Sequence, residues 1–255
     1  MAISRRSFAL GSLAAIAGPS VGAAAPADAS LTAPYKALSG EPYPVAGVDL
    51  TRIKPEFLRR EVQDSEIARR EPPGTIVVDP AKHFLYLVQP GGTAIRYGVG
   101  VGRSGFGWSG DATVNSKQAW PDWYPPREMF GRQPHLRRTL RRMPLGIGMP
   151  GGVGNPLGAR ALYLWQDNRD TLYRIHGTLE PWTIGSNVSS GCIRMINQDV
   201  IDLYERVEPG ARVVVLGAPQ GVIAGGGGSG AVGADGLPPL HMIVRDPESL
   251  ARGLW

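Results

Sequence analysis

The sequence is short of cysteine, histidine and metal-binding patterns. Cys192 is the only cysteine among 255 residues, so no disulfide can form within one chain. No CxxC or HxxxH pair and no carboxylate cluster accompanies it, and zinc needs three or four such ligands. The aromatic residues do not alternate with basic ones as they do in many nucleic-acid-binding proteins. We therefore predict no metal, no cofactor and no nucleic-acid partner.

Long apolar runs are also missing beyond the first thirty residues, so no later segment is expected to cross a membrane. At the N-terminus Arg5 and Arg6 form a pair, and no further charge follows until Asp28. Small residues end this stretch, with candidate cleavage sites after Ala25 and Ala29. The paired arginines resemble the twin-arginine export signal of bacteria. A membrane anchor is the alternative, because the length would suffice. The weak hydrophobicity favours a cleaved signal peptide over residues 1–29, with export to the periplasm.

Charge of either sign is sparse, and its balance is only mildly basic. The net charge is +5, and it falls to +4 if residues 1–29 are removed. One run of arginines could favour an anionic polymer, although a solvated loop or helix is the commoner meaning of such a run. The run consists of Arg137, Arg138, Arg141 and Arg142.

A lone cysteine in an exported protein needs a reason, because thiols are at risk in an oxidising compartment. This raises the expectation that Cys192 has a chemical role. The alternative is a small buried apolar residue, since free cysteine is often buried.

The remaining chain of about 225 residues is long enough for one good core. Proline and small residues over 30–46 are typical of a linker, and Pro55 favours a short helix over 55–63. We thus divide the chain into an N-terminal linker with a short helix (30–69), one domain (70–217), and a glycine-rich linker with a tail (218–255).

The domain is predicted to be rich in β-strands. Short β-branched and aromatic runs are separated by turn residues, which favours an antiparallel meander followed by a hairpin at DNRD. The region 103–158 has no clear periodicity and is expected to be functional. One helix follows the cysteine, with Asn197 as its N-cap and Pro209 and Gly210 after its end. The predicted strands are 75–79, 83–89, 94–102, 161–166, 171–177 and 211–216.

A nucleophilic thiol needs a base, because a free cysteine is mostly protonated at neutral pH. Of the four histidines, His176 is the best placed, at the end of a predicted strand and sixteen residues before Cys192. Spacing alone is weak support for this pair.

The wider pattern is more specific. The stretch IHGTLEPWTIGSNVSSGCIRMINQDV closely resembles the signature of the L,D-transpeptidase catalytic domain (YkuD-like, ErfK/YbiS-type), found in bacterial enzymes that remodel peptidoglycan. The segments TIVVDPAKHFLYLVQ, RYGVGVGR and GNPLGARALYL also look like core strands and loops of that family. The resemblance covers roughly 70–217. It departs from many members at Ser190, where they carry histidine.

This resemblance implies a mainly β fold, an L,D-transpeptidase-like β-sandwich of mixed and antiparallel strands with one or two short helices. It implies that Cys192 forms a thioester with a donor stem tetrapeptide and releases the terminal D-residue, with His176 as base and the Gly177 carbonyl orienting the imidazole. A second stem peptide is the expected acceptor. Carbapenem acylation of the cysteine is also expected.

Four residues around the cysteine are candidates for binding roles. Gly191 and Cys192, together with Ser190, could supply N–H groups to an oxyanion. Ser189 could bind substrate or simply shape the loop. Arg194 could clamp a carboxylate or brace the cysteine loop. Trp120, Trp123, Tyr124 and Trp182 could wall a groove over the thiol or belong to the core.

Several alternatives stay open at this point. Water in place of the acceptor amine would make the protein an L,D-carboxypeptidase, and a protein amine would make it a tethering enzyme. A papain-like hydrolase is disfavoured because there the cysteine usually precedes the histidine. A non-catalytic peptidoglycan-binding protein would not need both Cys192 and His176.

Overall fold

The computed structural model describes residues 29–63, 66–103, 108–125, 127–132, 134–189 and 191–217. The proposed signal peptide, apart from its last residue, and the glycine-rich tail lie outside the described residues, as does Ser190.

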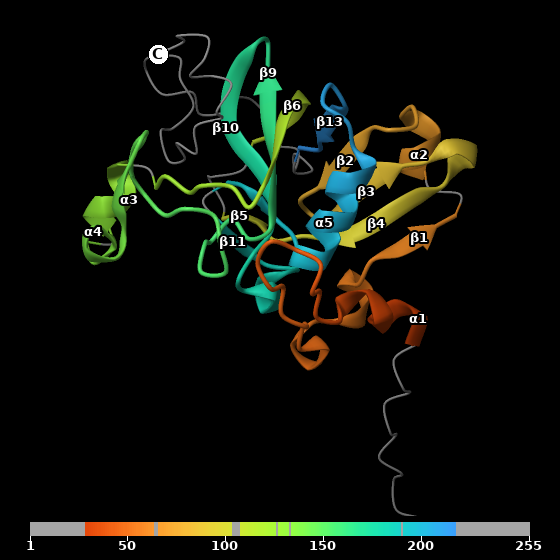
Figure 1. Ribbon diagram of the computed structural model, residues 1–255. Helices are drawn as coiled ribbons and strands as arrows, with labels where there is room; N and C mark the ends of the chain where they lie inside the picture. Colours follow the sequence, from red (N-terminus) through yellow and green to blue (C-terminus); the bar gives the residue numbers. More distant parts are fainter. Residues whose placement is uncertain are drawn as a thin grey trace, which may run out of the picture.

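A nine-stranded mixed sheet forms the body of the protein, in the order β1-β4-β3-β2-β13-β6-β9-β10-β12. The pairs β13–β2 and β10–β12 are parallel and the others are antiparallel. Figure 1 shows the β1–β4 end of the sheet turned at an angle to the β9–β10 end, with α5 between them. The mainly β class with mixed strands is therefore confirmed. The strands are β1 (Arg60–Val62), β2 (Ile76–Asp79), β3 (Phe84–Val88), β4 (Ala94–Gly98), β6 (Gly110–Ala119), β9 (Arg160–Gln166), β10 (Arg169–His176), β12 (Ile193–Arg194) and β13 (Arg212–Val215).

Smaller elements surround this sheet. β5 (Val101–Gly102) pairs in parallel with β11 (Asn187–Ser189), and β7 (Arg141–Met143) pairs with β8 (Gly146–Gly148). Figure 1 shows α3 (Arg127–Arg132) and α4 (Leu136–Thr139) on an arm at the side of the molecule. The remaining helices are α1 (Ala29–Thr32), α2 (Glu66–Arg70), α5 (Asn197–Arg206) and the 3-10 turns η1 (Ala33–Tyr35), η2 (Leu50–Arg52), η3 (Pro55–Phe57), η4 (Pro90–Gly92) and η5 (Pro181–Thr183).

The main core lies between the sheet and one face of α5. Val200, Leu203 and Val207 recur at helical spacing, so they form one apolar stripe on and just after α5. The stripe packs on the inward side chains of the strands, and burying such aliphatic groups contributes about 1.5–3 kcal/mol each. Partners in this core include Ile76, Val78, Leu85, Leu87, Val114, Leu162, Leu164, Ile175 and Met195.

Most predicted strands are confirmed within a residue or two, whereas the helix over 55–63 is wrong. Only Pro55–Phe57 is helical there, as one 3-10 turn, and Arg60–Val62 pairs with β4 instead. The aperiodic region 103–158 contains the ten-residue strand β6, which the sequence analysis missed. The N-cap of α5 is Ile196, and the Asn197 side chain is engaged elsewhere.

The N-terminal strap, which we define as residues 35–59, packs on the domain and is not a free linker. Tyr35, Val45 and Ile53 are buried. Tyr35 and Ile53 share a hydrophobic cluster with Ile184 and Ile196. The expectation of a linker over 30–46 is therefore wrong, because Tyr35 and Val45 among its prolines are buried against the rest of the protein or the strap itself.

Polar contacts hold the first half of the strap. Glu41 accepts two hydrogen bonds from the Arg160 guanidinium, at 2.7 and 2.8 Å. The Gln198 amide nitrogen donates to the carbonyl oxygens of Lys36 and Ala46. Such charge-assisted and buried bonds fix the strap against β9 and α5.

Candidate active site

His176 is the last residue of β10 and is almost fully buried. Its Nδ1 lies 2.6 Å from the carbonyl oxygen of Gly177. A carbonyl can only accept, so Nδ1 carries the proton and Nε2 is left as the basic nitrogen of the neutral ring. This is the orienting contact that the family resemblance implied.

Asn197 explains why glycine occupies position 177. Its Oδ1 accepts from the Ala159 N–H, and its Nδ2 donates to the Thr178 carbonyl, both at 3.0 Å. A Cβ atom on Gly177 would lie 2.1 Å from Asn197 Oδ1, and one on Gly158 would lie 2.2 Å from it. The side chain of the first α5 residue thus locks the two loops beside the histidine. The sequence analysis read this residue only as a helix cap.

Cys192 lies directly before β12, the edge strand that pairs in parallel with β10. The register places Ile175 beside Ile193 and His176 beside Arg194. Side chains alternate between the faces of a strand. Continued by one residue, the register puts Cys192 opposite Arg174 on the same face as His176. By this extended register Cys192 and His176 lie on the same face of neighbouring segments, and the thiol is buried. Their joint role in catalysis stays a prediction.

Ser189 shapes the cysteine loop. Its hydroxyl donates to the Cys192 carbonyl oxygen at 2.5 Å and accepts from the Gly191 N–H at 3.1 Å. Gly191 has φ +127°, a backbone conformation that favours glycine. Since the Gly191 N–H is engaged by Ser189, it does not point at an oxyanion in this structure.

Arg194 serves as a brace in this structure. Its Nη1 donates to Glu180 at 3.0 Å, which joins the cysteine loop to the loop after His176. Its backbone also pairs with Gly100 in both directions. Of the two roles expected for this arginine, the brace matches these contacts, because its carboxylate partner is internal.

Arg174 is a site residue that the sequence analysis missed. Its guanidinium is fully buried, binds both carboxylate oxygens of Asp170 at 2.7 Å, and lies over the Tyr163 ring. The available signal was an arginine two residues before His176 in the predicted strand, hence on the same face. A buried charge of this kind needs its partner in place to be tolerated.

The electrostatics favour neutral forms of both candidate catalytic groups. Burial raises the pKa of the Cys192 thiol to about 11, although Arg174 opposes this through its charge and a backbone hydrogen bond. Burial, reinforced by the charge of Arg194, lowers the pKa of His176 to about 4. At neutral pH the resting state is thus thiol and imidazole, and a proton can move between them only as reaction proceeds.

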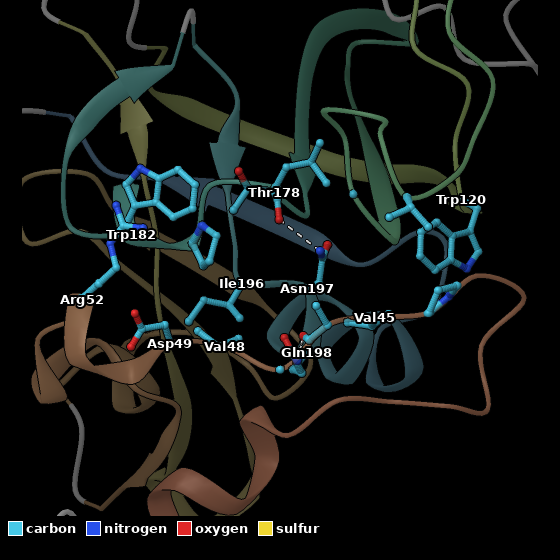
Figure 2. Close-up of a pocket in the computed structure, with 17 residues that line it drawn as sticks. Val45, Val48, Asp49, Arg52, Trp120, Thr178, Trp182, Ile196, Asn197 and Gln198 are labelled. Carbon is cyan, nitrogen blue, oxygen red and sulfur yellow. Dashed lines mark hydrogen bonds between the residues drawn. The ribbon is translucent and has the colours of Figure 1, made fainter.

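The four aromatic residues considered for a groove divide into two groups. Tyr124 is buried, and the half-buried Trp123 packs against the cluster of Leu157, Ala161 and Tyr163. Trp120 and Trp182 line a groove of about 280 Å³ between the N-terminal strap and the loop after His176. Figure 2 shows them at its two ends, with Thr178, Ile196 and Asn197 between them. Cys192 is not among the residues that line this groove, so these two tryptophans do not wall a groove over the thiol.

No metal centre competes with this site in the described ranges. Over those residues, no three His, Cys, Asp or Glu side chains gather as ligands. The same part of the chain also holds no helix with the length and hydrophobicity of a membrane span.

Comparisons with known proteins identify the family of the chain. The family model of the L,D-transpeptidase catalytic domain (YkuD) matches residues 73–215. The chain is 35% identical over 149 residues to the Escherichia coli protein named Probable L,D-transpeptidase YbiS, covering 56% of this chain and 45% of that protein. It is 32% identical over 183 residues to Probable L,D-transpeptidase YcfS of the same species, covering 69% and 53%. The chain belongs to the L,D-transpeptidase catalytic domain family.

These relatives are longer than the match. The chain spans about half the length of the curated relatives it resembles. A solved structure from Brucella melitensis, titled a probable carnitine operon oxidoreductase, is 50% identical over 66% of this chain and 99% of that chain, with a TM-score of 0.42. A superposition at that score carries no weight, so the family assignment rests on the sequence matches.

Proposed function

We propose that this protein is a peptidoglycan L,D-transpeptidase that works through a cysteinyl thioester. The observation that carries the proposal is the register of β10 with β12, which sets Cys192, directly before β12, on the same face as His176, whose ring is fixed by the Gly177 carbonyl. Membership of a family that acts on peptidoglycan peptides supports the substrate class.

In the first half-reaction the Cys192 thiol loses its proton to Nε2 of His176 as the sulfur attacks the carbonyl before the terminal D-residue of a donor stem tetrapeptide. The tetrahedral intermediate collapses, the C–N bond breaks, and the imidazolium returns its proton to the leaving amine. A thioester and the free D-residue result. The neutral resting state follows from the raised pKa of Cys192 and the lowered pKa of His176.

In the second half-reaction an amine of an acceptor stem peptide attacks the thioester. His176 accepts a proton from that amine and returns it to the departing sulfur, which leaves a new amide and the free enzyme. Water as the acceptor gives L,D-carboxypeptidase activity, and a protein amine gives tethering.

Neighbouring groups have supporting roles in this proposal. Arg174, oriented by Asp170, stabilises negative charge on the sulfur as the thiol ionises. Ser189 holds the cysteine loop, and the Cys192 N–H is the proposed oxyanion donor. Gly191 and Ser190 remain candidates for that role only if the loop rearranges when substrate binds.

We further propose that the protein acts in the periplasm after export through the twin-arginine-like signal at 1–29, with 70–217 as its catalytic domain. Peptidoglycan lies outside the cytoplasmic membrane, so an enzyme that acts on it must be exported.

Incubation of the mature protein with disaccharide-tetrapeptide, followed by mass spectrometry, tests the proposal. A cross-linked dimer with released D-residue is expected, and tripeptide alone would indicate a carboxypeptidase. Cys192→Ala is expected to abolish both products. Undiminished turnover in Cys192→Ala would overturn the thioester mechanism.

A further inference from the structure

A basic arm leaves the domain between β6 and β9. We define it as residues 127–148, which contain α3, α4, β7 and β8. Figure 1 shows α3 and α4 at one side of the molecule, away from the main sheet. The arm has six arginines and one glutamate, which gives a net charge of +5 with His135 neutral. This equals the net charge of the whole chain, so the basic excess is concentrated in the arm.

Four arginines of the arm are exposed without a carboxylate partner. None of them forms an ion pair with a carboxylate whose side chain the structure describes. By contrast, the exposed Arg70, Arg206 and Arg212 are each paired with a carboxylate. An arginine without such a partner keeps its charge for an anionic group on another molecule. The four residues are Arg137, Arg138, Arg141 and Arg142.

The arm is held in place at its base and along its length. Trp123 and Met149 exchange two backbone hydrogen bonds at 2.8 Å, just outside the two ends of the arm. The buried Asn155 side chain donates to the Met149 carbonyl oxygen at 3.1 Å. Within the arm, Leu136 and Leu140 are buried on either side of the first arginine pair. The arginines are therefore presented by a folded support, which lowers the ordering entropy that binding costs.

Apolar side chains lie beside the arginines on the β7–β8 hairpin. Arg142 is directly opposite Ile147 in the register, so their side chains lie on the same face. Ile147 is 43% exposed, although isoleucine is usually buried. At the turn Pro144 is exposed, and Met143 and Leu145 are half-buried. This face suits a partner that offers negative charge and an apolar layer next to each other.

The surface of a lipid bilayer offers both. Anionic phospholipids present phosphate groups that attract clusters of arginine and lysine. The boundary between head groups and acyl chains accepts apolar side chains. A nucleic acid would also attract the arginines, but it has no apolar layer for Ile147. The only Phe, Tyr or Trp of the arm, Phe130, is half-buried, whereas single-stranded nucleic acids typically stack on exposed aromatic rings.

We propose that the arm binds the surface of an anionic phospholipid bilayer. The four exposed arginines contact the lipid phosphates, and Ile147 enters the boundary between head groups and acyl chains. Attachment of this kind holds the domain at a membrane surface. The inference goes beyond the proposed function and does not depend on the thioester chemistry.

Cosedimentation of the mature protein with vesicles tests the proposal. We expect binding to vesicles of phosphatidylglycerol mixed with phosphatidylcholine, weakened by added salt, and no binding to phosphatidylcholine alone. Arg141→Gln combined with Arg142→Gln should weaken binding to the anionic vesicles at least about tenfold, because each basic residue near the surface contributes. Ile147→Ser should weaken it by about threefold.

Arg69→Gln combined with Arg70→Gln is the matched control. It removes the same charge from two adjacent exposed arginines on α2, which Figure 1 shows on the other side of the molecule from α3 and α4. This variant should bind the anionic vesicles like the parent. Urea unfolding should give similar midpoints for all the variants, because the replaced side chains are exposed.

Failure of the parent to bind the anionic vesicles, or equal losses in the two double variants, would overturn the inference. Duplex DNA serves as the competing polyanion. Tighter binding to DNA than to the vesicles, with vesicle binding unchanged in Ile147→Ser, would assign the arm to a nucleic acid and also overturn the inference.

Discussion

Cys192 is expected to be an unreactive thiol until substrate binds. Because burial raises its pKa, its alkylation by iodoacetamide should be slow at pH 7 and should increase with pH to an inflection above 9. The measurement is the alkylation rate constant from pH 5 to 11, followed by intact mass. Cys192 is the only cysteine, so the label reports one site. A plateau reached by pH 6 would instead indicate a preformed thiolate–imidazolium pair.

Replacement of Arg174 is expected to change both the reactivity of Cys192 and the stability of the fold. Arg174→Met should move the alkylation inflection of Cys192 to higher pH and slow alkylation at pH 8 by about tenfold, because a positive charge near the sulfur is lost. It should also cost about 3–5 kcal/mol of unfolding free energy, since Asp170 is left unpaired.

The double variant Arg174→Met with Asp170→Asn separates these effects. It should recover most of the stability, because no charge is stranded, while the inflection stays high. If the alkylation inflection of Cys192 in the double variant returns to its value in the parent together with the stability, Arg174 supports only the fold and does not act on the thiol.

The sequence pointed to Cys192 and His176 mainly through the family resemblance of the segments around them, because their spacing alone is weak support. Their catalytic roles stay a prediction. Arg174 and Asn197 were missed because their roles depend on tertiary neighbours. Gly191 was assigned a free N–H that the Ser189 hydroxyl in fact engages.

At the scale of elements, Asn197 connects α5 to the loops around His176. Asn197→Ala removes the partners of the Ala159 N–H and the Thr178 carbonyl, so we expect a loss of about 2 kcal/mol of unfolding free energy. The turnover number should fall as well, because the Gly177 carbonyl loses its support. Denaturant unfolding and steady-state kinetics measure the two effects.

Glu205→Ala is the matched control, since Glu205 is exposed on the same helix. It should change stability by less than about 0.5 kcal/mol. Equal effects of the two substitutions would contradict the locking role of Asn197.

Strands rich in β-branched residues could be predicted from the sequence, whereas strands rich in polar residues could not. β2 and β3 are short apolar runs with almost every residue buried, and β13 beside β2 is an apolar run in which Val213 and Val215 are buried. β6 reads GDATVNSKQA, and pairing with β13 and β9 overrides its weak propensity. The strand β1 replaced a predicted helix for the same reason, since β4 offered it a pairing edge.

For the whole molecule, two buried groups predict opposite effects of pH on stability. Asp199 is fully buried against the Tyr35 hydroxyl, near Arg59 and Asp202, and burial raises its pKa to about 7. Between about pH 4 and 7 Asp199 is protonated in the folded state and ionised in the unfolded state. The contribution of Asp199 to the unfolding free energy therefore falls as the pH rises through this range. The lowered pKa of His176 means that its neutral form stabilises the folded state. This contribution to the unfolding free energy is lost as the pH falls from about 6.5 to 4.

The two effects should largely cancel in the parent protein. In Asp199→Asn the unfolding free energy, relative to the parent, should gain up to about 4 kcal/mol between pH 4 and 7. Urea unfolding at pH 4, 5.5 and 7 measures this difference. Parallel pH profiles of the two proteins would show that Asp199 ionises normally in the fold.

The mainly β class followed from sequence at this scale, but the attachment of the strap did not. Composition over 30–46 resembles a linker, and only the positions of a few residues reveal its docking. Tyr35, Glu41 and Val45 each find a partner on β9, α5 or within the strap, which no local pattern encodes.

The most direct test of the thioester is to trap the acyl-enzyme. Intact-protein mass spectrometry of the mature protein quenched during turnover of stem tetrapeptide should show the mass of the added tripeptide acyl group. Peptide mapping should place it on Cys192, and neutral hydroxylamine should remove it. An adduct on another residue, or turnover that continues in Cys192→Ala, would contradict the account.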